Sequence, residues 1–153
     1  KTRNPYLVFV GDGEEGARLR DLSSDLEWVR FLGFRNQSEL PSIYAMSDVF
    51  ALPSRDEPWG LSVNEAMACG TAVISTDQCG CSVDLVDDSV GRSVPADDCD
   101  ALAVALTEVL ADPITTATMG RAAQDRIATW SYAEDITGLK AALKVVGEMP
   151  FLT

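Results

Sequence analysis

The chain alternates short apolar runs with longer stretches in which apolar residues recur every three or four positions. The runs are typical of buried strands, and the periodic stretches are typical of helices that cover a parallel sheet. Five strands are expected, the last at a sheet edge: 7–10, 28–32, 48–52, 71–75 and 91–94. Helices are expected at 14–23, 38–46, 62–69, 100–110, 114–129 and 132–146, with a turn at 84–88. This order predicts an α/β fold, a Rossmann-like parallel sheet flanked by helices, in a single domain over residues 1–153.

The composition is that of a folded domain that does not span a membrane. The 153 residues are enough for one domain with its own core. Hydrophobic residues make up 46% of the chain and charged residues 24%, which opposes disorder. No apolar run approaches the roughly 20 residues that cross a bilayer, and no secretory signal is recognised at the start of the sequence. We therefore expect a cytoplasmic protein.

The net charge of −12, with no histidine, excludes nucleic acid as a partner, because phosphate backbones require a basic face. The cysteines do not form the two close pairs, or the pair with histidines, that are typical of a structural zinc site. They are expected to be thiols in a reducing compartment and not metal ligands: Cys69, Cys79, Cys81 and Cys99.

A G-x-G-x-x-G pattern at residues 11–16 joins the first expected strand to the first expected helix. In dinucleotide-binding proteins this pattern meets the pyrophosphate, and an acidic residue that closes the second strand holds the ribose. Here the second strand closes at 33–35, which reads Gly-Phe-Arg. Glu14 and Glu15 in the first helical turn favour the helix dipole but repel a pyrophosphate. We interpret the glycines as a tight turn and not as an NAD site.

The stretch 52–71 carries the candidate chemistry. Glu57 lies in a loop at the carboxyl end of the third expected strand, the edge at which parallel sheets bind ligands. Gly60 and Leu61 follow, where a helix begins and its backbone N–H groups can bind an anion. Glu65 comes in about the first turn of that helix, and its carboxylate can accept hydrogen bonds from both hydroxyls of a vicinal diol. Ser62 and Glu65 also have the spacing of a capping box, in which Glu65 serves only the helix end. The pattern alone leaves both interpretations open.

Residues 52–71 resemble the signature of glycosyltransferase family 4. In that signature two glutamates, here Glu57 and Glu65, are separated by seven residues, and an Ala-Met-Ala-x-Gly helix end follows, here at 66–70. Other family segments are similar in the same order, over roughly residues 6–145: the strand ending in Gly-Asp-Gly at 7–13, the strand ending in Leu-Gly and an aromatic residue at 29–34, the Leu-Pro-Ser segment at 40–54 and the Gly-rich loop at 79–91. The chain is therefore identified as a C-terminal, donor-binding domain of this family that lacks its first β–α unit.

The resemblance implies one half of a GT-B fold and a retaining, metal-independent transfer of a hexose from a nucleotide diphosphate sugar, with no cofactor. Glu57 is the implied catalytic residue, beside the reacting carbon, and Glu65 the implied ligand of the ribose. The implied contacts to the rest of the donor are Gly60, Leu61 and Ser62 at the diphosphate or sugar, Phe34, Arg35 and Leu40 near the base, and Gly11 and Gly13 along the cleft. The sequence departs from the family at Trp59, where phenylalanine is commoner, and at Cys81 and Asp84, where glycine and glutamate are common.

The resemblance also implies parts that lie outside these residues. A preceding β–α unit carries an arginine and a lysine for the donor phosphates, and an N-terminal domain binds the acceptor. The isolated chain is therefore expected to be inactive, with a short sheet whose unpaired edge invites self-association. Donor sugar, base, acceptor, oligomeric state and peripheral attachment of the whole enzyme to a membrane are left open.

Two alternatives remain on the same scaffold. One is a non-catalytic nucleotide-binding or interaction domain, which the presence of both Glu57 and Glu65 opposes. The other is a sugar-nucleotide epimerase of GT-B fold, which the absence of histidine opposes.

Overall fold

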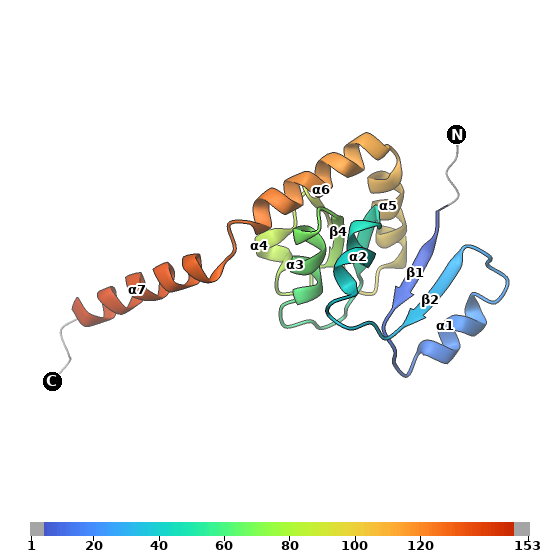
Figure 1. Ribbon diagram of the computed structural model, residues 1–153, viewed down its shortest axis with the longest axis horizontal. Helices are drawn as coiled ribbons and strands as arrows, with labels where there is room; N and C mark the ends of the chain where they lie inside the picture. Colours follow the sequence, from blue (N-terminus) through green and yellow to red (C-terminus); the bar gives the residue numbers. More distant parts are fainter. Residues whose placement is uncertain (1–4, 149–153) are drawn as a thin grey trace. The chain divides into compact units, whose positions relative to one another are not determined.

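The computed structural model describes residues 5–148. It contains two compact units, divided in the sequence between Leu40 and Pro41, and each unit has its own parallel sheet. Figure 1 shows the order of the elements along the chain, from the blue N-terminal strands to the red C-terminal helix. The α/β class with parallel strands, predicted from the hydrophobic pattern, is confirmed.

The first unit is a βαβ arrangement of β1 (Leu7–Val10), α1 (Gly16–Leu22) and β2 (Val29–Gly33). The two strands are parallel, and Phe9 lies opposite Phe31 with their rings stacked at 4.9 Å between centroids. The guanidinium of Arg20 on α1 lies over the Phe31 ring, 4.4 Å from its centroid. Val29 is the only buried side chain among residues 5–40, so the core of this unit is small.

The second unit is built on three parallel strands in the order β3-β4-β5. These strands are β3 (Val49–Leu52), β4 (Ala72–Thr76) and β5 (Gly91–Val94). Six helices accompany them: α2 (Leu40–Ala45, beginning at the last residue of the first unit), α3 (Leu61–Ala68), α4 (Ser82–Leu85), α5 (Cys99–Leu110), α6 (Pro113–Ile127) and α7 (Tyr132–Glu148). All five residues of β4 are buried, as expected for the central strand of a sheet covered on both faces.

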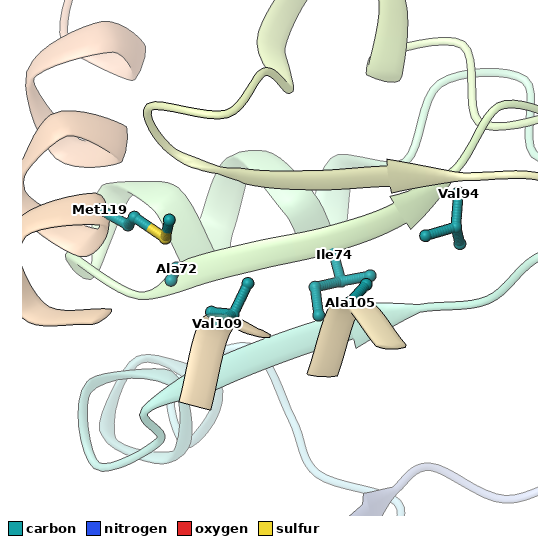
Figure 2. Close-up of a cluster of buried hydrophobic side chains, with 6 residues drawn as sticks. All are labelled: Ala72, Ile74, Val94, Ala105, Val109 and Met119. Carbon is teal, nitrogen blue, oxygen red and sulfur yellow. The ribbon is translucent and has the colours of Figure 1, made fainter. Parts of the chain in front are cut away.

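The core of the second unit lies against one face of β4. Figure 2 shows a cluster from β4, β5, α5 and α6, formed by Ala72, Ile74, Val94, Ala105, Val109 and Met119. Because successive strand residues point to opposite faces, Val73 and Ser75 face the other way. The Ser75 hydroxyl there lies 2.6 Å from that of Ser82 on α4, and the Ser82 hydroxyl donates to the Thr76 carbonyl at 2.7 Å. The cluster and this hydroxyl network fix β4 from both sides.

Helices α5 and α6 begin at aspartate caps. Asp98 accepts a hydrogen bond from the Ala101 N–H at 2.8 Å, and Asp112 accepts one from the Thr115 N–H at 2.9 Å. The two helices meet at a bend of 101°. Within residues 5–148 no single helix is long and apolar enough to cross a membrane, and α5 and α6 pass such a test of length and composition only as this bent pair.

Two features differ from the sequence expectation. The turn predicted at 84–88 is preceded and partly overlapped by α4, a single helical turn closed by the Leu85 N–H donating to the Cys81 carbonyl at 2.8 Å. One turn is too short to show periodicity in the sequence. The short sheet is two sheets, because β1 pairs with β2 and does not pair with β3. In the predicted assignment a preceding β–α unit supplies the first strand, so β1 and β3 are the second and fourth strands of a Rossmann-like order. In that order the second and fourth strands flank the first and do not pair with each other. That one domain unites both units stays a prediction.

Gly120 on α6 gives a test of the packing in the second unit. A Cβ at this position would lie 2.1 Å from the Gly70 carbonyl oxygen, at the left-handed residue (φ +77°) that follows α3 as predicted. We expect Gly120→Ala to lower the free energy of unfolding by about 1–3 kcal/mol, because overpacking outweighs the gain in helix propensity. Gly138→Ala on α7, where a Cβ would meet nothing within 4 Å, is the matched control and should not be destabilising. Denaturant unfolding measures both, and equal stability of the two variants would contradict the packing at Gly120.

Candidate functional site

The loops that follow β3 and β4 are paired with each other at the carboxyl edge of the sheet. Glu57 and Cys79 form a parallel bridge, with the Glu57 N–H donating to the Gln78 carbonyl at 3.1 Å and the Gly80 N–H donating to the Glu57 carbonyl at 2.9 Å. The Cys81 N–H then donates to the Trp59 carbonyl at 2.9 Å. The backbone of Glu57 is therefore held by both its N–H and its carbonyl, as in a strand.

Small and buried residues allow this approach of the two loops. A Cβ on Gly80 would lie 2.2 Å from the Pro58 carbonyl oxygen, and a Cβ on Gly60 would lie 3.2 Å from the Cys81 sulfur. The Cys81 thiol is fully buried, and this desolvation raises its pKa to about 11, so the group stays neutral. Cys81, at a position where the resemblance led us to expect glycine, thus fills space beside Gly60 at the start of α3. Within residues 5–148, no group of three or more His, Cys, Asp or Glu side chains could hold a metal ion.

Helix α3 begins at Leu61, with Gly60 as its N-cap in the left-handed region at φ +96°. The Val63 N–H donates to the Gly60 carbonyl at 2.8 Å, whereas helix geometry leaves the N–H groups of Leu61 and Ser62 without an intrahelical acceptor. These groups and the positive end of the helix dipole favour an anion at this point. The sequence prediction of a helix start at Gly60 and Leu61 is confirmed.

The Glu57 side chain lies beside the start of α3, since a Cβ on Gly60 would be 3.5 Å from Glu57 Cγ. It is half-buried, and its Oε1 atom accepts a hydrogen bond from the Trp59 N–H at 3.4 Å. The Trp59 indole N–H donates to Asn64 Oδ1 at 3.1 Å, and its ring lies 5.8 Å from that of Trp130. Trp59 therefore connects the Glu57 loop to α3 and to the residues just before α7.

Glu65 lies at the beginning of the second turn of α3, later than the sequence suggested. Its Oε2 atom accepts a hydrogen bond from the Tyr44 hydroxyl on α2 at 3.1 Å. The capping box is not formed, because the helix begins at Leu61 and Ser62 is already inside it, where no side chain caps the helix. The interpretation of Glu65 as a helix cap is therefore wrong. Glu65 is also among the residues that line a shallow groove, with Asn64, Ala68, Gln124, Ile127, Ala128 and Trp130.

The other predicted site residues lie in the first unit. The Gly11 N–H donates to the Gly33 carbonyl at 2.8 Å, so β1 and β2 end side by side and Phe34 follows at the same edge. Phe34 is 78% exposed, as suits a residue that would stack on a base, and Arg35 pairs with Glu39 at 3.2 Å. Gly13 follows in the loop after β1, and Leu40 is the first residue of α2. That these residues and the glutamates form one site stays a prediction.

Two participants in the second unit were not predicted. Tyr44 is 21 positions before Glu65 in the sequence, and Trp130, which contacts Trp59, lies in the link between α6 and α7. Neither residue has a neighbour of unusual type, so no local pattern could have identified them. Gly80 did carry a signal in the sequence, since a glycine within a strand-like segment often marks a place where another backbone approaches closely.

Known proteins similar to this chain are glycosyltransferases. The family model described as "Glycosyl transferases group 1" matches residues 1–126. The GDP-mannose-dependent monoacylated alpha-(1-6)-phosphatidylinositol monomannoside mannosyltransferase of Corynebacterium glutamicum is 36% identical over an alignment of 135 positions that covers 82% of this chain. The chain spans only 35% of the length of that relative.

Solved structures agree with this family match. Sucrose-phosphate synthase from Thermosynechococcus elongatus is 31% identical with a TM-score of 0.76, over 92% of this chain and 39% of that one. The Anabaena protein HepE in complex with UDP-glucose is 29% identical with a TM-score of 0.71, over 81% of this chain and 36% of that one. The predicted glycosyltransferase relationship and the GT-B fold class are thereby confirmed.

Gly80 tests whether the paired loops hold Glu57. Because its Cβ would meet the Pro58 backbone, we expect Gly80→Ala to displace residues 57–59 and to shift their amide NMR signals strongly. The overpacking should also lower the free energy of unfolding by about 1–3 kcal/mol. Gln78→Ala, on the same loop, is the control, because it removes an exposed side chain and keeps the carbonyl that accepts from Glu57. Unchanged Glu57 and Trp59 signals in Gly80→Ala would contradict this account of the loop.

Proposed function

Because this chain belongs to the glycosyl transferases group 1 family, we propose that it is the donor-binding portion of an enzyme that transfers a sugar from a nucleotide diphosphate sugar to an acceptor. We place the enzyme in glycosyltransferase family 4, with retention of the anomeric configuration, no metal ion and a cytoplasmic location. The observation that carries the proposal is that the Glu57 loop and the first amides of α3 lie at one carboxyl edge, with Glu65 one turn further along the same helix.

The donor class is a hexose on a nucleoside diphosphate. One similar protein is named as GDP-mannose-dependent, and another was solved in complex with UDP-glucose. Both donors share a ribose, a diphosphate and a hexose. These are the groups that we assign to residues of the second unit. The base differs between them, guanine in one donor and uracil in the other.

Glu57 is assigned to the hydroxyls of the transferred sugar. Its backbone is fixed by two hydrogen bonds to the loop after β4, so its carboxylate is presented from a rigid support. A carboxylate accepts hydrogen bonds from sugar hydroxyls and stabilises positive charge that develops at the neighbouring anomeric carbon. The amides of Gly60, Leu61 and Ser62 lie within the same short segment and would receive the diphosphate as its bond to the sugar breaks.

Electrostatics explains why this portion would not act alone. The net charge is −12, and several arginines already pair with carboxylates: Arg18 with Glu15, Arg35 with Glu39, Arg55 with Asp97, Arg92 with Glu108, and Arg126 with Asp87. The cations for the donor phosphates are proposed to come from a preceding β–α unit, and the acceptor site from an N-terminal domain. In both sheets an outer strand, β1 or β3, has one edge without a strand partner among residues 5–148, which such a unit could pair with.

A transfer assay tests the function. The complete natural polypeptide that contains this chain should transfer hexose from GDP-mannose, UDP-glucose or a related donor, and residues 1–153 alone should not. Holding donor and acceptor together is worth about 7–11 kcal/mol in favourable cases, and the chain alone lacks the acceptor half. Glu57→Gln should lower kcat by about 100-fold or more, on the scale of a lost electrostatic stabiliser. Asp56→Asn, the same change of charge one position away, is the control. Robust transfer by residues 1–153, or by Glu57→Gln, would overturn the assignment.

Glu65 is assigned to the ribose diol, and Glu65→Gln tests this. A charged hydrogen bond contributes about 1.5–3 kcal/mol, so nucleoside diphosphate affinity should fall about tenfold or more. The melting temperature should change little, because the glutamine oxygen can still accept from the Tyr44 hydroxyl. Calorimetric titration and thermal unfolding measure the two effects, with Glu27→Gln, at an exposed glutamate between α1 and β2, as a control of equal charge change. Lower stability with unchanged affinity would show that Glu65 is a structural residue.

A further inference from the structure

We propose that Tyr44 is a positioning residue, which holds the Glu65 carboxylate ready for the two ribose hydroxyls of the donor. The proposal rests on the proposed function of Glu65 and extends it to a residue on another helix. Its basis is the hydrogen bond of 3.1 Å from the Tyr44 hydroxyl to Glu65 Oε2, which joins α2 to α3 within the second unit.

Tyr44 is itself fixed at three points. Its side chain is only 7% exposed, and its ring meets the Phe50 ring of β3 edge to face at 5.3 Å. Its backbone carbonyl accepts a buried hydrogen bond at 2.8 Å from the hydroxyl of Thr71, the residue just before β4. The hydroxyl therefore projects from a support anchored to two strands, and it has little freedom to follow a moving glutamate.

The hydroxyl is also a permanent donor. Burial and, second, the hydrogen bond to Glu65 raise the pKa of Tyr44 above its ordinary value, so the phenol keeps its proton at neutral pH. Among residues 5–148 no ion pair involves Glu65, and the nearby Cys69 thiol has a pKa raised by burial and then by the Glu65 charge. A neutral donor orients the carboxylate without cancelling the charge that makes it a strong acceptor.

The geometry leaves capacity for the ligand. An ionised carboxylate has about four acceptor positions, and Tyr44 occupies one of them on Oε2. Two hydroxyls of a vicinal diol can use the others. A free glutamate would lose side-chain freedom on binding, whereas one already held by Tyr44 has lost part of that freedom beforehand, which favours affinity.

A purely structural role is the rival explanation, because a buried tyrosine hydroxyl needs an acceptor in any case. The two roles differ in one measurable respect. A structural bond affects stability and all ligands alike, whereas a positioning bond affects only ligands that carry the ribose hydroxyls. The discriminating quantity is the ratio of affinities for a nucleoside diphosphate and its 2′,3′-dideoxy form.

The experiment uses the complete natural polypeptide and titrates GDP, UDP and their 2′,3′-dideoxy forms against Tyr44→Phe, Glu65→Gln and the double variant. Tyr44→Phe keeps the ring on Phe50 and should weaken the better-bound ribonucleotide about fivefold, the scale of one hydrogen bond, while the dideoxy form changes less than about twofold. The double variant should bind like Glu65→Gln alone, because Tyr44 acts through Glu65. Tyr132→Phe, at a side chain 85% exposed, is the matched control.

The outcomes separate the two levels of the proposal. If Glu65→Gln lowers the ribo-to-dideoxy ratio and Tyr44→Phe does not, the positioning role is overturned and the assignment of Glu65 stands. If Glu65→Gln leaves the ratio unchanged, the ribose assignment fails and the role of Tyr44 fails with it. A Tyr44→Phe variant that weakens both forms equally shows a structural role. Melting temperatures without nucleotide confirm that each variant folds. If Tyr44→Phe does not fold, Thr71→Val replaces it, because this change removes the hydrogen bond to the Tyr44 carbonyl and keeps the Tyr44 hydroxyl. Thr71→Val should then lower the ribo-to-dideoxy affinity ratio by a smaller amount.

Discussion

The backbone pairing of Glu57 with the loop after β4 is the constraint on which the candidate site depends. Parallel pairing of β3 with β4 ends at Leu52 and Ser75. The two segments that follow these strands are then unpaired for a few residues, until the Glu57–Cys79 bridge pairs them again. The close contact of Gly80 with Pro58 leaves no room for a side chain there. Because the bridge sets where residues 57–60 lie, it also sets where α3 begins and hence the position of Glu65 one turn later.

The two glutamates are held in different ways. Glu57 is placed through its backbone, and its carboxylate makes one long hydrogen bond, with the Trp59 N–H. Glu65 is placed on a helix and is then held through its carboxylate by Tyr44. This difference matches the two proposed tasks, because a ribose is the same in every donor whereas the anomeric carbon of the hexose flattens and gains positive charge as its bond to the diphosphate breaks. A rigid ligand for the constant group and a more adaptable one for the reacting group fit that requirement.

Local signals account for what the sequence could predict. The start of α3 at Gly60, its end before Gly70 and the aspartate caps of α5 and α6 are encoded within a few residues, and these boundaries were predicted to within one or two positions. Local signals could not decide the role of Glu65, because the Ser62–Glu65 spacing fits a capping box as well as a ligand-binding glutamate. Tyr44 depends on how α2 packs against α3 and β3, a contact between residues 21 positions apart. Such contacts have no local pattern, so they became visible only in the folded chain.

The small core of the first unit bears on how a donor would be bound. Two strands and one helix with a single buried side chain are close to the lower limit of independent stability, whereas β4 of the second unit is buried along its whole length. Segments with few buried contacts open at low free-energy cost, and segments in a continuous core open only with the whole domain. The proposed ribose and sugar contacts therefore stand on the rigid unit, and the proposed base contacts at Phe34 and Arg35 stand on the more easily deformed one. Base recognition by this chain would then depend on whatever pairs with the free edge of β1, since a third strand supplies the stability that this unit lacks.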